Sequence, residues 1–228
     1  KKQGKVKFLA ASQHGGNTAE ICAAMIESGY FDHLQPALSL NPTPAQLQML
    51  ELAKKHDVGI IAKKMMGSVG LAKRDPVVRK KVEAALGPDG KLGAAVIKAA
   101  LTLPGVTAVT PLTRTFEMLN DNLTNGGIAL TPSETRALAA LRTPEFAPCN
   151  YCGECLARCP RGIPISTVLR YAAYFSVYGE RRNARDAYRR LPARQRADQC
   201  QQCGGCAEVC PLSLPVPERL RRAHALLA

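Results

Sequence analysis

The segments 149-CNYCGECLARCP-160 and 200-CQQCGGCAEVCP-211 decide how the second half of this chain folds. In each segment two, two and three residues separate the four cysteines, and a proline follows the fourth cysteine. The second segment lies 51 positions after the first, and the match continues beyond the cysteines, because PRGIPI (160–165) aligns with PLSLPV (211–216). Two copies in one register argue against chance and indicate that the eight cysteines share one role.

This spacing is typical of chains that bind [4Fe–4S] clusters, because three close thiolates can reach three corners of a cube from one short loop. In two-cluster ferredoxins the fourth cysteine, which precedes a proline, ligates the other cluster. We therefore expect two [4Fe–4S] clusters with exchanged fourth ligands. The first takes Cys149, Cys152, Cys155 and Cys210, and the second takes Cys200, Cys203, Cys206 and Cys159.

Zinc and disulfides are the alternative uses of these cysteines. Structural zinc is closed by two ligand pairs, not by a triplet with a distant fourth ligand. Disulfide frameworks belong to short secreted chains. The doubled motif therefore favours iron–sulfur clusters over both alternatives.

The 228 residues are 46% hydrophobic and carry a formal net charge of +13. That length suggests one or two globular domains, and no apolar run reaches the ~18 residues of a membrane-spanning helix. The sequence opens KKQGKVKF, with no methionine and no visible signal peptide. We interpret it as a fragment that lacks its true N-terminus, and we expect a cytoplasmic protein with no membrane partner.

The first half alternates between strand-like and helix-like segments. The expected strands are 5–12 (a short buried strand), 32–39, 58–66 and 106–112, and the expected helices are 17–29, 45–56, 76–86, 92–103 and 115–124. A capping box, Thr131 to Glu134, opens a further helix that runs to about Arg142. The cysteine-rich half is expected to be helical, with helices at 163–179 and 180–191 and a terminal helix after Val216.

Strict alternation indicates parallel strands with outer helices. A doubly wound sheet would also alternate, although the loop after the first strand lacks a G-x-G-x-x-G fingerprint. Four such units are also half of an eightfold barrel. We expect an α/β fold with a first domain at 1–142, for which the alternation leaves both arrangements open, and an all-α dicluster ferredoxin-like domain at 143–228.

The first half resembles the aldo/keto reductases, and the whole chain is similar to the branch with a C-terminal helical ferredoxin domain. The resemblance is carried by GKVKFLAASQH (4–14), DHLQPALS (32–39), GIIAKKMMG (59–67) and PGVTAVTPLTRTFEMLNDNL (104–123), which are similar to strands five to eight of that family. It implies that residues 1–142 are the C-terminal half of a (β/α)8 TIM barrel that reduces carbonyls with NAD(P)H. The catalytic residues of the family lie on its first four strands, so no catalytic residue is assigned here.

The resemblance also implies a set of nicotinamide cofactor residues at strand ends, where such barrels place their sites. Ser12, Gln13 and Gln35 would hold the carboxamide, Lys64 and Met66 would lie beside the pyrophosphate, Thr113 would bind phosphate, and Asp121 and Asn122 would lie at the adenine. Lys63 stands where the family commonly has a stacking tyrosine. Leu112 and Met118 replace the basic residues that usually bind the 2′-phosphate of NADP, which leaves Arg114 as the substitute.

The leading hypothesis is therefore an NAD(P)H-dependent oxidoreductase that acts on a small carbonyl substrate and carries an electron-transfer domain. The alternative is an electron-relay module on a degenerate, non-catalytic barrel. The arginine-rich segment 181–196 could bind nucleic acid, but its single aromatic residue, Tyr188, is expected to pack inside a helix, and we expect no nucleic-acid partner. Arg181, Arg182, Arg185, Arg189 and Arg190 instead suggest docking of an acidic carrier such as ferredoxin or flavodoxin.

Overall fold

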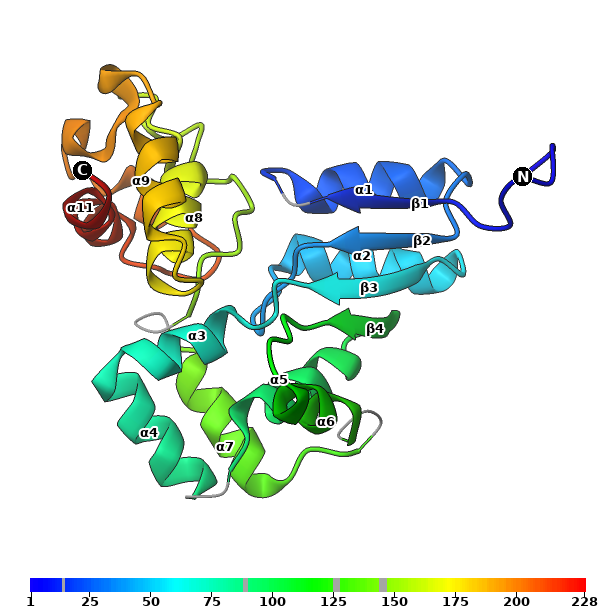
Figure 1. Cartoon of the computed structure of the whole chain (residues 1–228). Coiled ribbons are helices and arrows are strands. Elements are labelled where there is room, and N and C mark those ends of the chain that lie inside the picture. Colours follow the sequence, from blue (N-terminus) through cyan, green and yellow to red (C-terminus); the bar gives the residue numbers. More distant parts are fainter. Residues whose placement is uncertain (14, 88–89, 125–127, 144–146) are drawn as a thin grey trace.

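The structure is a computed structural model that describes residues 1–13, 15–87, 90–124, 128–143 and 147–228. A four-stranded parallel sheet organises the first half, and a group of helices beside it forms the second half (Figure 1). The strands are β1 (Ala10–Gln13), β2 (His33–Pro36), β3 (Gly59–Lys63) and β4 (Val106–Thr110). The helices of the first half are α1 (Thr18–Glu27), α2 (Pro44–Lys55), α3 (Gly67–Arg74), α4 (Pro76–Leu86), α5 (Leu92–Leu101), α6 (Phe116–Thr124) and α7 (Pro132–Leu141).

The strands follow one another across the sheet in chain order, β1-β2-β3-β4, and each neighbouring pair is parallel. In the register of β1 and β2, Ala10 lies opposite His33 and Ser12 lies opposite Gln35. A doubly wound sheet reverses its strand order at a switch point, and the four described strands show no reversal. The sheet is thus singly wound, and within the described chain β1 and β4 are its edges.

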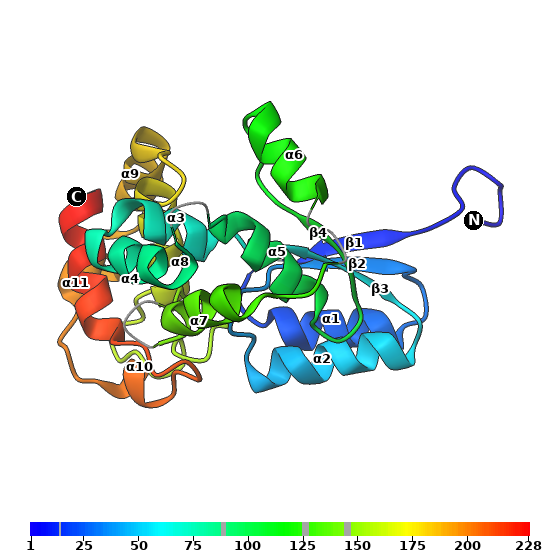
Figure 2. The same cartoon turned by 90° about the horizontal axis from the view of Figure 1, so that it is seen from below.

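The two faces of the sheet differ in burial. Helices α1 and α2 cover one face (Figure 2), against which Leu34 and Ala62 are fully buried. Because successive residues of a strand point to opposite faces, Gln35 and Lys63 belong to the other face, where they are only half-buried. Helix α6 lies on that open side (Figure 2). The open face therefore carries polar side chains beside α6.

Helix α7 begins with the predicted capping box. The hydroxyl of Thr131 accepts a hydrogen bond from the Glu134 N–H at 3.2 Å, and the Glu134 carboxylate accepts one from the Thr131 N–H at 2.7 Å. Lys98 Nζ on α5 donates to the same carboxylate at 2.8 Å, and these two side chains are 6% and 12% exposed. Burial alone would raise the pKa of Glu134, but the bonds from Lys98 and from the Thr131 N–H outweigh it and hold the pKa below its usual value. The pair ties α5 to α7.

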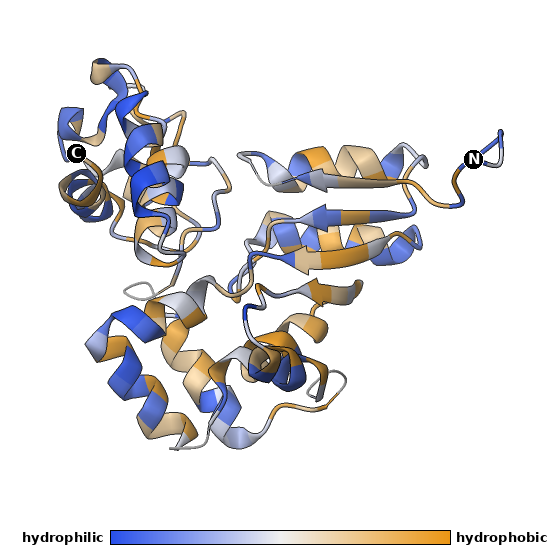
Figure 3. Ribbon diagram, in the orientation of Figure 1, coloured by the Kyte–Doolittle hydropathy of each residue, from blue (hydrophilic) through white to orange (hydrophobic). Residues whose placement is uncertain are grey.

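The second half is helical, as the sequence predicts. Its helices are α8 (Ile165–Ser176), α9 (Arg181–Arg189), α10 (Gly205–Glu208) and α11 (Val216–Leu227), with short 3-10 turns at Ala193–Gln195 and Ala197–Gln199. Helices α8 and α11 have 12 residues each and begin 51 positions apart, so the internal repeat extends to the fold. Helix α9 is mainly hydrophilic (Figure 3).

The buried apolar side chains form two clusters. One runs from Cys22 to Leu141 and lies under the sheet, and the other runs from Ala147 to Leu227 and joins α8, α9 and α11. Cys22 is fully buried in the first cluster, as expected for a core cysteine. Among the described residues, no helix has both the length and the apolar character needed to cross a bilayer.

The structure corrects two details of the first half. The expected buried strand 5–12 is limited to β1, and Val6 and Phe8 before it are 46% and 69% exposed, because β1 is an edge with no further strand beside it. Residues 67–74, which follow β3 and were not expected to be helical, form α3. The start of the expected second domain at 143 lies next to residues 144–146, which are outside the described residues.

Candidate metal centre

Each cysteine segment forms a loop with the same backbone conformation. Tyr151 and Gln202 occupy equivalent positions in the two copies and have φ values of 55° and 54°. Gly153 and Gly204 follow with φ values of 91° and 83°, a region that glycine adopts at little cost. The loops therefore curl back on themselves, which brings the cysteines before and after each turn near one another.

In the described part of the chain, four of the eight cysteines line one pocket and the other four line a second pocket. The first pocket contains Cys149, Cys152, Cys155 and Cys210. The second pocket contains Cys159, Cys200, Cys203 and Cys206. Each pocket thus takes three cysteines from one copy of the motif and the fourth cysteine from the other copy, which is the grouping that the sequence predicts for exchanged ligands.

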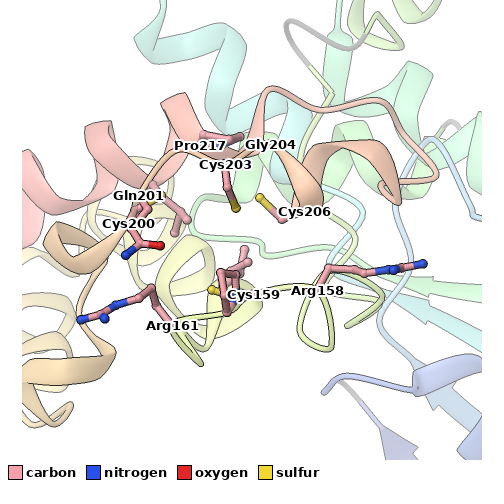
Figure 4. A pocket seen from close by; sticks show the side chains of 12 residues that line it. Arg158, Cys159, Arg161, Cys200, Gln201, Cys203, Gly204, Cys206 and Pro217 are labelled. Carbon is pink, nitrogen blue, oxygen red and sulfur yellow. The ribbon is translucent and has the colours of Figure 1, made fainter.

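The donor set fits a cube better than a single ion. In the second pocket the sulfur atoms of Cys159, Cys203 and Cys206 turn toward one shared space (Figure 4). Among the described residues, no group of three or more thiols, imidazoles or carboxylates is arranged to hold one metal ion. Each thiolate of a [4Fe–4S] cluster binds a different iron atom, so its four sulfurs surround a space and do not meet at a point.

Burial raises the pKa of four of the eight pocket thiols, which favours their protonated form. Burial raises the pKa of Cys149 and of Cys155 to about 12, and neighbouring thiols add to the shift. Burial likewise raises the pKa of Cys152 and of Cys206. Four thiolates could not share such a pocket without positive charge, so a bound metal must displace these protons. The Tyr151 N–H donates to the Cys149 sulfur at 3.3 Å, a contact of the kind that stabilises a thiolate ligand.

The loop of the first pocket is anchored to the sheet by Asn150, which the sequence analysis did not single out. Its side chain is 7% exposed. Its amide oxygen accepts a hydrogen bond from the Ser39 hydroxyl, and its amide nitrogen donates to the Asn41 carbonyl and, at 3.3 Å, to Gln46 Oε1. The equivalent residue of the second copy, Gln201, is exposed. The difference between the two copies was the only sequence signal for this contact.

A second contact holds the same loop against the end of β1. The Asn17 N–H donates to the Cys152 carbonyl at 3.0 Å. A Cβ on Gly153 would approach Gly16 Cα within 3.2 Å, so the two backbones lie close together. The first pocket therefore lies at the carboxyl ends of the strands, beside the residues predicted to hold a nicotinamide.

Three of those predicted residues lie together on β1 and β2. Ser12 and Gln35 are register partners, and Gln13 follows Ser12 on the edge strand. Lys63 reaches across from β3 and donates a hydrogen bond to the Ser12 hydroxyl. Burial lowers the pKa of Lys63, and the neighbouring positive charge of Lys64 lowers it further.

The remaining predicted residues form separate groups. Asn122 Nδ2 on α6 donates to the Thr113 hydroxyl at 2.9 Å, and Asp121 pairs with Lys91. Lys64 has a φ of 68°, and its ammonium lies over the rings of Tyr174 and Tyr178 on or just after α8, at 5.2 and 5.3 Å from their centroids.

Met66 is the N-cap of α3 and packs against the first hydrophobic cluster. The Lys64 side chain points toward α8, and Met66 begins α3. These two residues therefore do not form one group with Ser12 and Gln35.

Comparison with known families identifies one part of the chain. Residues 145–214 match the family model of the 4Fe-4S dicluster domain. A dicluster domain is therefore present here, and together with the cysteines at 149–210 it supports iron–sulfur clusters and a role in electron transfer or oxidoreduction. The match does not extend to the sheet, and no curated protein matches the chain.

Proposed function

We propose that this chain is an oxidoreductase in which an aldo/keto reductase-like half-barrel is joined to a domain with two [4Fe–4S] clusters. The observation that carries the proposal is the grouping of the cysteines, three from one copy and one from the other in each pocket. Cys149, Cys152, Cys155 and Cys210 would hold the first cluster, and Cys200, Cys203, Cys206 and Cys159 would hold the second. When bound, each cluster supplies transfer of one electron per step.

The half-barrel assignment is supported by the sheet. Its parallel strands keep chain order without reversal, as the strands of a (β/α)8 barrel do. In a complete (β/α)8 barrel, further strand–helix units would cover the open face and both edges of this sheet. Helix α6 has no buried residue, and Phe116 and Leu123 on it are 86% and 70% exposed, so it too has an apolar surface that further units would cover.

The proposed cofactor site lies at the carboxyl ends of β1 and β2. Ser12, Gln13 and Gln35 offer hydroxyl and amide groups that suit a carboxamide, and Thr113 with Asn122 would bind the other end of NAD(P)H. The proposed substrate is a small carbonyl compound. We propose domain limits at 1–142 and 143–228, which the two separate hydrophobic clusters support. Eight cysteines that serve as cluster ligands rather than in disulfides suit a reducing compartment such as the cytoplasm.

One observation favours a second candidate, an electron relay on a non-catalytic scaffold. Lys63 donates a hydrogen bond to the Ser12 hydroxyl, which is then less free to bind a carboxamide. In the aldo/keto reductases this position commonly holds an aromatic residue that stacks on the nicotinamide. A lysine there would repel the positively charged ring of an oxidised nicotinamide.

Cofactor titration separates the two candidates. The reconstituted chain is titrated anaerobically with NADH and NADPH, followed by nicotinamide fluorescence, alongside Gln35→Ala and the control Gln48→Ala, an exposed position of α2 on the opposite side of the sheet. The reductase proposal expects saturable binding that Gln35→Ala weakens about tenfold, the loss of one or two hydrogen bonds. A featureless titration of the parent chain would favour the relay.

A further inference from the structure

The two pockets differ in their access to the surface. All four cysteines of the first pocket are half-buried, and the loops after β1 and β2 hold its cysteine loop through Asn17 and Asn150. In the second pocket Cys206 is buried and Cys159 and Cys200 are half-buried, but Cys203 is exposed, so this pocket reaches the surface at Cys203. A protein that exchanges electrons with this chain from outside can therefore approach the second pocket most closely.

The two pockets also differ in charge. Arg158 and Arg161 line the second pocket, both are exposed, and no carboxylate lines that pocket. The two arginine side chains extend away from the pocket on either side of Cys159 (Figure 4). Neither guanidinium forms an ion pair with a carboxylate of the described residues. The first pocket instead carries Glu154 and no basic residue in its lining.

The arginines of α9, from which the sequence predicts carrier docking, do not lie at either pocket. Arg185 Nε donates to the Leu226 carbonyl and Arg189 Nη2 to the Ala228 carbonyl, both at 3.1 Å. These are favourable positions for cations, because the carboxyl end of a helix carries partial negative charge. Arg185 and Arg189 therefore stabilise the end of α11, and the arginines in the lining of the second pocket are Arg158 and Arg161.

We propose that a small acidic one-electron carrier protein docks over the second pocket, with Arg158 and Arg161 contacting its carboxylates. One electron passes from the reduced carrier to the oxidised second cluster, or in the reverse direction, with no bond made or broken. The first cluster then connects the second to the carboxyl ends of the strands. The proposal rests on the proposed function, because it requires a cluster in the second pocket.

The test measures binding separately from electron transfer. The probe is an acidic plant-type [2Fe–2S] ferredoxin whose iron is replaced by gallium, so that it binds without reacting. Its Kd for the reconstituted chain is measured by calorimetry from low to high salt. The variant is Arg158→Glu/Arg161→Glu, and the matched control is Arg182→Glu/Arg190→Glu, which makes the same charge change at exposed positions on α9 and at its C-cap.

We expect the Kd of the parent chain to rise steeply with salt, because screening weakens charge attraction. The pocket variant should bind about tenfold or more weakly at low salt and lose most of the salt dependence, whereas the control should stay within about threefold. Equal weakening of both variants, or a Kd indifferent to salt, would overturn the docking site. Iron analysis of the same samples keeps the outcomes apart: clusters without binding refute the docking alone, and absence of iron refutes the proposed function.

Discussion

Replacing Asn150 by alanine tests how the first pocket is coupled to the sheet. The change removes the hydrogen bonds to the Ser39 hydroxyl and the Asn41 carbonyl. The site is buried, since Ser39 is 6% exposed and Asn150 is 7% exposed. Gln46 keeps its bond to the Thr43 N–H, so two groups lose a partner. A lost bond of this kind costs about 1 kcal/mol net, and more where the remaining partner stays buried. We therefore expect the free energy of unfolding to fall by about 2–3 kcal/mol.

The assay is anaerobic urea unfolding of the reconstituted chain, followed by circular dichroism. Gln201→Ala is the matched control, because Gln201 occupies the equivalent position of the repeat and is exposed. It should change stability by less than about 0.5 kcal/mol. As a second readout, Asn150→Ala should hasten removal of the first cluster by an iron chelator and leave the second unaffected. Equal stabilities and equal rates of iron loss in the two variants would refute the anchoring role of Asn150.

Three further results are expected. Cys22 should resist a thiol reagent at pH 8 until the chain unfolds, because it is fully buried and burial raises its pKa to about 11. The other eight thiols should become reactive as soon as the clusters are removed. Lys98→Met should destabilise the chain by about 3 kcal/mol in urea unfolding, because it leaves the largely buried Glu134 carboxylate without its cationic partner. Adding Glu134→Gln should recover most of the loss, because glutamine removes the unpaired charge and can keep the capping bond to the Thr131 N–H. NADH and NADPH should bind within about tenfold of each other in fluorescence titration, because neither Leu112 nor Met118 offers a charge to a 2′-phosphate.

Local chemistry in the sequence predicts much of this structure. The cysteine repeat fixes which residues gather in each pocket, because ligand spacing is a local property, and the capping box at Thr131 places the start of α7. Alternating strand and helix signals give four parallel strands in chain order.

Contacts between distant segments could not be predicted. Gly67 and Gly70 argue against a helix by propensity, yet α3 forms, and a Cβ on Gly70 would come within 2.2 Å of Val177 Cγ1. The glycine allows α3 to approach the end of α8, a partner more than a hundred residues away. In the same way Asn150 differs visibly from Gln201, but only the fold shows that it reaches Ser39.

The central claim is that two [4Fe–4S] clusters exchange their fourth ligands. The most direct measurement is iron and sulfide analysis with electron paramagnetic resonance of the reduced, reconstituted chain and of three variants, Cys152→Ala, Cys203→Ala and Cys159→Ala. We predict about eight iron atoms and eight sulfides per chain, and a Cys159→Ala spectrum that matches Cys203→Ala and not Cys152→Ala. About two zinc atoms without iron, or a Cys159→Ala spectrum that matches Cys152→Ala, would contradict the claim.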